Sequence, residues 1–173
     1  GAGIDVLLKP SGFTGDFYDG REPGSNGLAV DAEGRLLLCQ HGDRRISRLE
    51  AGRFVPLAER FEGKRFNSPN DLVIAGDGAI YFTDPPFGLP RVFDDPAKET
   101  PWSGVYRLKD GRLTLLTREL RGPNGLAFSP DETVLYVVES RATPNRLILA
   151  FDVAGDRLRN QRVFIDAGPG TPD

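Results

Sequence analysis

At residues 122–128 the chain reads Gly-Pro-Asn-Gly-Leu-Ala-Phe, and at residues 24–30 and 68–74 it reads Gly-Ser-Asn-Gly-Leu-Ala-Val and Ser-Pro-Asn-Asp-Leu-Val-Ile. Each stretch places an Asn at its third position, directly before a short apolar run. These Asn residues are 44 and 54 positions apart (70 − 26 and 124 − 70). A turn rich in Asp, Gly or Pro follows each run, so the chain repeats one supersecondary unit three times.

Each repeat continues with three further short stretches that have the composition of β-strands and are separated by turn residues. These strands are expected at 36–39, 45–49 and 53–57 in the first repeat, at 80–83, 104–108 and 113–116 in the second, and at 134–138, 147–151 and 162–165 in the third. No window of about 11 residues holds a 3.6-residue period, so essentially no helix is expected.

Four antiparallel strands per repeat predict an all-β fold, a β-propeller of which this chain carries about three four-stranded blades. We expect residues 1–173 to form a single partial β-propeller domain. Its repeats span about 24–67, 68–121 and 122–167. Residues 4–9 are interpreted as the last strand of an earlier blade, and residues 168–173 as the turn that opens the next. Because three blades leave open sheet edges, we expect the remainder of the propeller in the same or a second polypeptide. The alternative is a β-sandwich with three similar hairpins.

The composition excludes several classes of protein. The 173 residues suit one domain, and 22 basic and 25 acidic side chains leave a net charge of −3 with no basic block, which argues against a nucleic-acid-binding protein. No apolar run reaches the roughly 18 residues of a membrane helix, and the N-terminus lacks the plan of a signal peptide. We therefore expect a soluble protein with no membrane partner, cytoplasmic rather than periplasmic. The single Cys39 and single His41 exclude an internal disulfide and a zinc cluster of Cys and His ligands.

The three Asn turns are expected to meet at one mouth of the propeller axis. In an up-and-down blade the first strand starts where the second ends, so Asn70 lies beside Asp84, and Asn26 beside His41. Amide and carboxylate oxygens are the hard donors that calcium selects, so a calcium site where Asn70 and Asn124 converge is one interpretation of these turns. The alternative for each Asn is a turn-forming role, which we favour for Asn26.

Four segments carry a resemblance to a known family. They are Leu-Cys-Gln-His-Gly-Asp-Arg-Arg-Ile (38–46), Gly-Lys-Arg-Phe-Asn-Ser-Pro-Asn-Asp-Leu (63–72), Tyr-Phe-Thr-Asp-Pro-Pro-Phe-Gly (81–88) and Arg-Gly-Pro-Asn-Gly-Leu-Ala-Phe-Ser-Pro-Asp-Glu (121–132). Taken in order, they resemble the regucalcin/gluconolactonase/luciferin-regenerating enzyme-like family, in its bacterial gluconolactonase branch. The resemblance implies a six-bladed propeller with one catalytic divalent metal at the axis, which hydrolyses sugar-type or related lactones.

The resemblance also implies a set of metal ligands. Asn124 matches the ligand Asn of the family, Asn70 matches an Asn one blade earlier that contacts metal or substrate, and Asp173 matches an Asp that opens a later blade. The first-blade Glu of the family, which stands in a Glu-Gly-Pro stretch, is absent here. Glu22, in Arg-Glu-Pro-Gly, is interpreted as a poor substitute because it precedes the wrong turn.

Three further residues are candidates for substrate binding. Arg65 precedes the Asn70 turn and is expected to hydrogen-bond a sugar hydroxyl or a developing oxyanion, with a solvated surface Arg as the alternative. His41 is a candidate substrate contact or a structural imidazole. Asp84 is a candidate that orients a ligand or caps the bend that follows it. The long stretch 85–103 is interpreted as a lid, with a surface excursion as the alternative.

These residues together predict a lactone hydrolase in which a divalent ion polarises the lactone and activates water. Calcium is the expected cofactor, with zinc, magnesium or manganese as other divalent ions. Asp173, Asn70 and Arg65 are the predicted catalytic residues, and a small-molecule lactone is the predicted substrate. Two alternatives remain open from the sequence: phosphotriester hydrolysis at the same site, and a non-catalytic calcium-binding propeller fragment.

Overall fold

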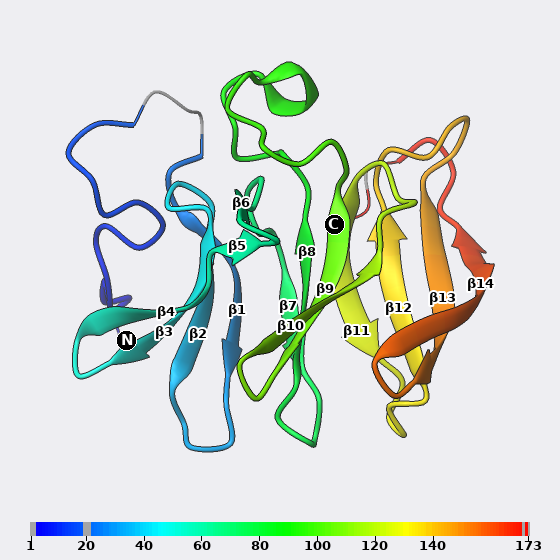
Figure 1. Cartoon of the computed structure of the whole chain (residues 1–173), viewed down its shortest axis with the longest axis horizontal. Coiled ribbons are helices and arrows are strands. Elements are labelled where there is room, and N and C mark those ends of the chain that lie inside the picture. Colours follow the sequence, from blue (N-terminus) through cyan, green and yellow to red (C-terminus); the bar gives the residue numbers. More distant parts are fainter. Residues whose placement is uncertain (1–2, 19–21, 171, 173) are drawn as a thin grey trace.

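The computed structural model describes residues 3–18, 22–170 and 172 of the chain, and it forms three four-stranded antiparallel sheets (Figure 1). The first sheet contains β1 (Ser25–Val30), β2 (Leu36–Gln40), β3 (Arg45–Glu50) and β4 (Arg53–Ala58). The second contains β7 (Leu72–Ile74), β8 (Ile80–Asp84), β9 (Gly104–Lys109) and β10 (Arg112–Thr117). The third contains β11 (Pro123–Phe128), β12 (Val134–Glu139), β13 (Leu147–Ala154) and β14 (Arg157–Asp166). Within each sheet the strands lie side by side in chain order.

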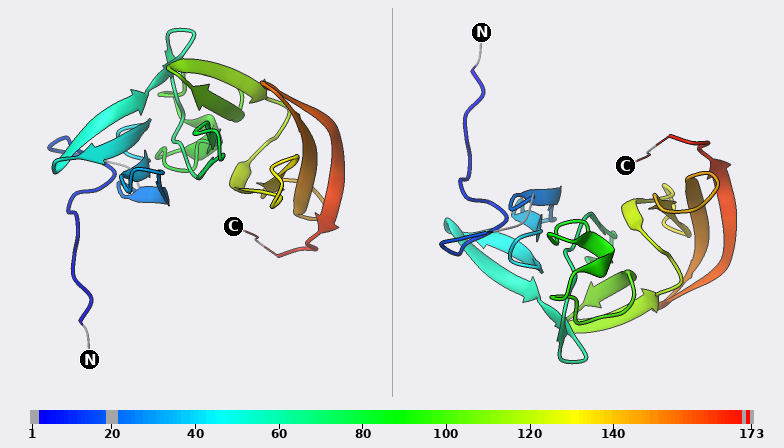
Figure 2. Two further views of the ribbon diagram at one scale, coloured as in Figure 1. Left: turned by 90° about the horizontal axis from the view of Figure 1, so that it is seen from below. Right: turned by 90° about the horizontal axis from the view of Figure 1, so that it is seen from above.

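The three sheets follow one another along an arc, with their first strands on the inside and their last strands on the outside (Figure 2). β1 contacts β7, and β11 contacts both β7 and β8. The backbone N–H of Gly27 donates to the carbonyl of Asn70 at 2.7 Å, and the Thr83 hydroxyl donates to the carbonyl of Asn124 at 2.8 Å. Three sheets joined through their inner strands are blades of a propeller, as the repeats predicted, and the β-sandwich alternative is wrong.

The turn residues explain why each blade reverses where it does. In the β7–β8 turn the Asp77 side chain accepts the N–H of Ala79 at 2.9 Å, and Gly78 has a φ of +82°. A residue with a side chain is rarely found at that φ, whereas Gly takes it without steric cost. In the β1–β2 turn Asp31 accepts the N–H of Arg35 in the same way, at 2.8 Å.

Two hydrophobic cores lie between the blades, and β8 contributes to both. Its side chains alternate between the two faces of the sheet, so Ile80 and Phe82 belong to the core shared with the first blade, while Tyr81 belongs to the core shared with the third. All five residues of β8 are buried. Phe82 stacks on Tyr106 with ring centroids 5.3 Å apart, which adds an aromatic contact to the first core.

The structure departs from the expected elements at three places. Residues 4–9 form no strand, so their interpretation as part of an earlier blade is wrong. The first blade is followed by a small ribbon of β5 (Arg60–Phe61) and β6 (Lys64–Arg65), which the repeats did not predict. The first strand of the second blade begins only at Leu72. The single helical element of the described residues is a 3-10 turn, η1 (Val92–Asp94), so the expectation of essentially no helix is confirmed for the described part of the chain.

None of the described residues forms a helix that is both long and apolar enough to cross a membrane. Two of the six residues expected to open the next blade, at positions 171 and 173, lie outside the described residues. The other four form no strand.

Candidate functional site

The three Asn turns line one cavity of about 460 Å³ at the inner edge of the blades. Asn70 is buried, Asn124 is half-buried and Asn26 is exposed within this space. The predicted convergence of these side chains from successive blades is therefore confirmed. The remaining lining residues are Glu22, Phe87, Leu89, Val92, Ser140, Arg141 and Arg146.

The strand register places each Asn turn at the mouth. Ser25 pairs with Gln40, and Pro123 pairs with Glu139, so the start of each first strand faces the end of the second. The register shifts between Ser25 and Leu28, and again between Pro123 and Leu126. Each shift coincides with an Asn, and bulges of this kind re-aim side chains at the rims of sheets.

The backbone before two of the Asn residues is held by a buried carboxylate. Asp84 accepts the N–H groups of Asn67 and Ser68, three and two residues before Asn70, at 2.9 Å each. Burial raises the pKa of Asp84 to about 7, although the two N–H donors and Arg44 favour its ionised form. Asp84 is fully buried and does not line the cavity. The fold therefore does not place Asp84 where it would contact a substrate in this cavity, as the sequence predicted.

Glu139 performs the same task in the third blade. Its carboxylate accepts the N–H groups of Arg121 at 2.6 Å and Gly122 at 2.9 Å, again three and two residues before the Asn of that blade, Asn124. It also accepts the N–H of Arg141 at 2.9 Å. We call the Asp84 and Glu139 arrangements carboxylate clamps. The three bonds to Glu139 depend on a loop geometry that sequence spacing does not give.

His41 lies behind two of the Asn amides. Its Nε2 is 3.2 Å from Asn26 Nδ2 and 3.5 Å from Asn70 Nδ2, and its Nδ1 is 3.4 Å from Glu22 Oε2. Burial lowers the pKa of His41 to about 4, so the imidazole is neutral at pH 7. A neutral ring protonated at Nδ1 presents its one Nε2 lone pair to the amide groups of Asn26 and Asn70. This arrangement turns the amide Nδ2 groups toward His41 and leaves both Oδ1 atoms free of that ring. His41 does not line the central cavity, so the structural alternative describes it better than a substrate contact.

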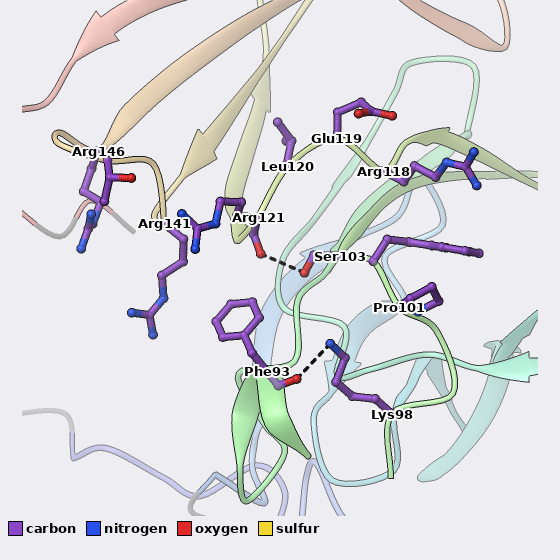
Figure 3. Close-up of a pocket in the computed structure, with 12 residues that line it drawn as sticks. Phe93, Lys98, Pro101, Ser103, Arg118, Glu119, Leu120, Arg121, Arg141 and Arg146 are labelled. Carbon is purple, nitrogen blue, oxygen red and sulfur yellow. Dashed lines mark hydrogen bonds between the residues drawn. The ribbon is translucent and has the colours of Figure 1, made fainter. Parts of the chain in front are cut away.

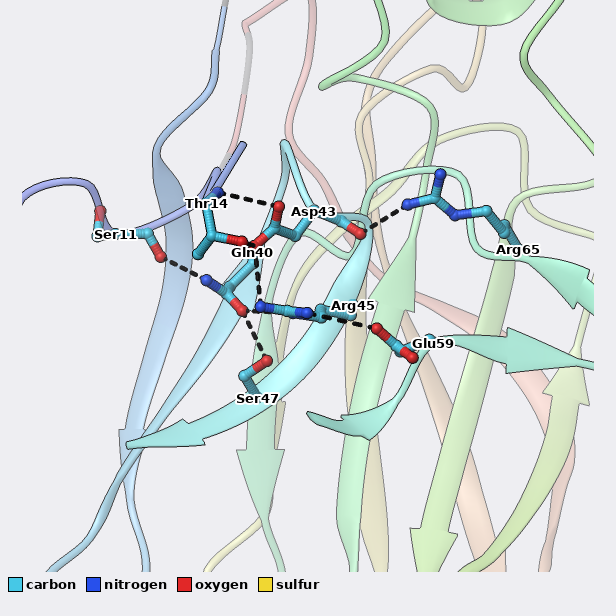
Figure 4. Close-up of polar contacts among 8 residues, drawn as sticks. All are labelled: Ser11, Thr14, Gln40, Asp43, Arg45, Ser47, Glu59 and Arg65. Atoms are coloured by element: carbon cyan, nitrogen blue, oxygen red, sulfur yellow. Dashed lines mark hydrogen bonds and ion pairs between the residues drawn. The ribbon is translucent and has the colours of Figure 1, made fainter. Parts of the chain in front are cut away.

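Arg65 lies outside this cavity. Its guanidinium donates to the carbonyl of Asp43 at 2.9 Å (Figure 4). Its backbone N–H donates to Glu99 at 2.8 Å. The proximity of Arg65 to Asn70 in sequence does not carry over into space, because Arg65 ends the β5–β6 ribbon before the chain turns inward at the buried Phe66 and Asn67. The fold does not support its predicted roles at the oxyanion or a sugar hydroxyl.

The cavity contains the donor types that suit a hard divalent ion. Three amide side chains and the Glu22 carboxylate border it, and oxygen donors of this kind suit calcium. The sequence interpretation of Glu22 as a poor substitute is corrected in one respect: the structure brings it to the same cavity as Asn70 and Asn124. Asp173, the remaining predicted ligand, lies outside the described residues. Within the described residues no group of three or more His, Cys, Asp or Glu side chains is placed so that it could hold a metal ion.

The stretch 85–103 forms one wall of the cavity through Phe87, Leu89 and Val92. Its far end is tied down where Arg44 donates to the carbonyl of Ala97 at 3.0 Å. The Tyr18 hydroxyl donates to the carbonyl of Gly88 near its start. Figure 1 shows this stretch rising over the end of the sheets at which β1 begins. The placement agrees with a covering segment rather than with an excursion away from the site.

The chain is similar to known proteins in sequence and in structure. Residues 8–173 match the model of the SMP-30/Gluconolactonase/LRE-like region. A gluconolactonase from Zymomonas mobilis is 43% identical over 185 residues, an alignment that covers 99% of this chain and 52% of that protein. A solved gluconolactonase from Xanthomonas campestris is 44% identical with a TM-score of 0.77, over 87% of this chain and 52% of that one.

A more distant likeness supports the fold alone. The calcium-binding protein regucalcin from Agrobacterium tumefaciens is 21% identical, with a TM-score of 0.61 over 83% of this chain and 46% of that one. The chain thus spans about half the length of the gluconolactonases it matches.

Proposed function

The chain belongs to the SMP-30/gluconolactonase/LRE-like family, and from this premise we propose that the protein with its complete ring is a divalent-metal-dependent lactone hydrolase. Two gluconolactonases at 43% and 44% identity support the lactone as substrate class. The observation that carries the proposal is the convergence of Asn26, Asn70 and Asn124 on one cavity. The propeller fold brings the three turns to one mouth, and an amide at the same place in each turn supplies oxygen donors there that a divalent ion can use.

Asn70 and Asn124 are the amides proposed to hold the ion, with Asp173 as the proposed carboxylate ligand and Glu22 on the same cavity. The chemistry that a bound divalent ion supplies is polarisation of a carbonyl oxygen and a lowered pKa of bound water. Calcium suits the oxygen donors of this cavity.

Hydrogen bonds within the chain preorganise this cavity for a ligand. The carboxylate clamps fix the backbone before Asn70 and Asn124, and His41 orients the amides of Asn26 and Asn70. Such preorganisation lowers the cost of binding and of reaching the transition state. The apolar wall of Phe87, Leu89 and Val92 limits access of bulk water on one side.

Proton transfer at this cavity has one described candidate. Glu22 is the carboxylate of the described residues that borders the cavity, and its side chain is 60% exposed. In hydrolysis the water oxygen bonds to the lactone carbonyl carbon, the ring C–O bond breaks, and the released ring oxygen takes up a proton. We propose that Glu22, or Asp173, accepts a proton from the attacking water.

The test replaces Asn124 and Asn70 by Ala, one at a time, in the protein with its complete ring. We expect calcium affinity to fall by about tenfold or more and kcat/KM for an aldonolactone to fall by about 100-fold, because each change removes a ligand oxygen. Titration calorimetry and a pH-indicator assay of ring opening measure the two effects. Asn160→Ala, on the exposed strand β14, is the control. Full activity and unaltered calcium binding in both variants would refute the proposal.

A further inference from the structure

A second cavity, of about 510 Å³, lies beside the central one and is bordered by an excess of basic side chains. Its walls come from three connections of the second and third blades: residues 93–103, 118–121 and 141–146. Both blades that bound it belong to this chain. We call it the basic side pocket, and its basic residues are Lys98, Arg118, Arg121, Arg141 and Arg146.

The five basic residues have little acidic compensation. Glu119 is the one carboxylate among the described residues that line the pocket. None of the five basic side chains forms an ion pair with a carboxylate of the described residues. A cleft lined by one sign of charge concentrates ligands of the opposite sign.

Aromatic faces and backbone carbonyls hold several of these cations in place. The Arg141 guanidinium lies 5.5 Å from the ring centroid of Phe93 and 5.8 Å from that of Phe87. Lys98 Nζ donates to the carbonyl of Phe93 at 3.2 Å. In the view of Figure 3, Arg121, Arg141 and Arg146 lie along one side of the pocket, and Lys98 and Arg118 along the other.

Arg146 carries unused hydrogen-bonding capacity. Its NH1 group donates to the carbonyl of Ala142 at 2.6 Å, but its buried Nε has no acceptor among the described residues. An unsatisfied buried donor is costly, and a guanidinium is suited to the two oxygens of a carboxylate or phosphate group. An anion in the pocket would give these donors a partner.

Arg141 and Arg146 also line the central cavity, and they are the two residues common to both spaces. A molecule bound at the three Asn residues would therefore lie next to the wall that the central cavity shares with the basic side pocket. We infer that the basic side pocket binds an anionic substituent of the lactone, a carboxylate or a phosphate ester, and thereby selects anionic over neutral lactones. This inference rests on the proposed lactone hydrolysis and adds the substrate class to it.

The experiment compares three lactones of one sugar series with the protein in its complete ring: a neutral aldonolactone, its carboxylate counterpart and its phosphate ester. We expect wild type to hydrolyse at least one anionic lactone with a higher kcat/KM than the neutral one. In Arg141→Gln and Arg146→Gln the ratio of anionic to neutral kcat/KM should fall by about 10- to 100-fold, the range expected for a lost hydrogen bond to a charged group. Comparison of kcat/KM for the carboxylate lactone and the phosphate-ester lactone identifies which anion is preferred.

Two controls keep the result interpretable. Arg53→Gln removes an exposed guanidinium from the first blade and should leave the ratio unchanged. If a Gln variant fails to fold, the wild-type ratio is measured while NaCl is raised to about 1 M, where the Debye length is about 3 Å, and we expect it to decline toward one.

The two proposals fail in different ways. Hydrolysis of the neutral lactone with no preference for either anion, or a ratio that neither Arg variant lowers, would overturn the inference and leave the lactonase proposal intact. Absence of hydrolysis of all three lactones in a folded, calcium-loaded protein would overturn the proposed function, and the inference with it.

Discussion

The second and third blades support their Asn turns with a carboxylate, whereas the first blade has an amide at the matching place. Asp84 and Glu139 each accept two backbone N–H groups ahead of Asn70 and Asn124. Gln40 stands at the matching place in the first blade, but its oxygen accepts Arg45 Nε at 2.8 Å and the Ser47 hydroxyl at 2.6 Å, and its amide donates to the carbonyl of Ser11.

The local sequence explains this difference. Three residues before Asn26 the chain has Pro23, which offers no N–H to a clamp, whereas the matching residues before the other two Asn are Asn67 and Arg121. The comparison teaches that one repeat can keep its strands and its turn while it changes the groups that fix the turn. The two clamped Asn residues are also the two that the family resemblance assigns to the metal.

Glu139→Ala should give the largest loss of stability. It leaves the N–H groups of Arg121, Gly122 and Arg141 without their acceptor, and we expect a loss of about 3 kcal/mol in the free energy of unfolding. Gln40→Ala, which breaks bonds to side chains and one carbonyl, should cost about 2 kcal/mol. Urea unfolding measures both. Glu119→Ala, an exposed carboxylate nearby, is the control with a loss below about 0.5 kcal/mol. A larger loss for Gln40→Ala than for Glu139→Ala would contradict the importance of the clamp.

Asp84→Asn should lower the free energy of unfolding by an amount that depends on pH, because it changes the carboxylate clamp of the second blade. The pKa of Asp84 is about 7 in the folded chain and near 3.8 when unfolded, so between these values the folded state binds more protons. The contribution of Asp84 is therefore most favourable below about pH 4 and declines as pH rises toward 7. Arg44 and Lys98 face this carboxylate and oppose the shift.

We accordingly expect Asp84→Asn to be destabilised relative to wild type by on the order of 2 kcal/mol at pH 4.5, and by less at pH 7.5. Urea unfolding at both pH values gives the difference, with the exposed Asp94→Asn as a control that should not vary. If the gap widens with rising pH, the pKa of Asp84 is lowered by its N–H donors and not raised by burial.

Gln40→Glu should produce the smallest effect. The carboxylate loses the hydrogen bond to the carbonyl of Ser11 and adds a buried charge, while Arg45 Nε and the Ser47 hydroxyl remain as donors. These terms nearly offset, and we expect a loss of about 1 kcal/mol in thermal unfolding experiments. A gain in stability would show that the first blade tolerates a carboxylate as well as its neighbours do.

The repeats predicted the strands and the meeting of the Asn turns because both follow from local chemistry. Strand composition and Asp-Gly turns are properties of a few adjacent residues, and an up-and-down blade leaves one position for the start of its first strand. The position of Glu22 at the central cavity could not be predicted, because it depends on the path of the chain before β1, which carries no periodic signal. The position of Arg65 outside that cavity could not be predicted either, because β5 and β6 are two residues each, too short to leave a pattern.

The basic side pocket was missed for a different reason. Its cations come from three connections that are up to 48 residues apart (146 − 98), and each Arg by itself resembles a solvated surface residue. No motif joins them. Only the packing of the second blade against the third places Arg118 and Arg121 near Arg141 and Arg146.

The burial of β8 on both faces gives the chain a definite order of local opening. Tyr81 and Phe82 project into opposite cores, so amide exchange at this strand requires the packing of three blades to loosen together. The outer strand β14 is exposed along most of its length and packs the partly buried Leu158 against the second core, so it can fray with little effect on the core. We therefore expect the backbone amides of the second blade to exchange more slowly than those of the other two. Opening of the first and third blades is coupled to the second, as it is between neighbouring repeats of a repeat protein.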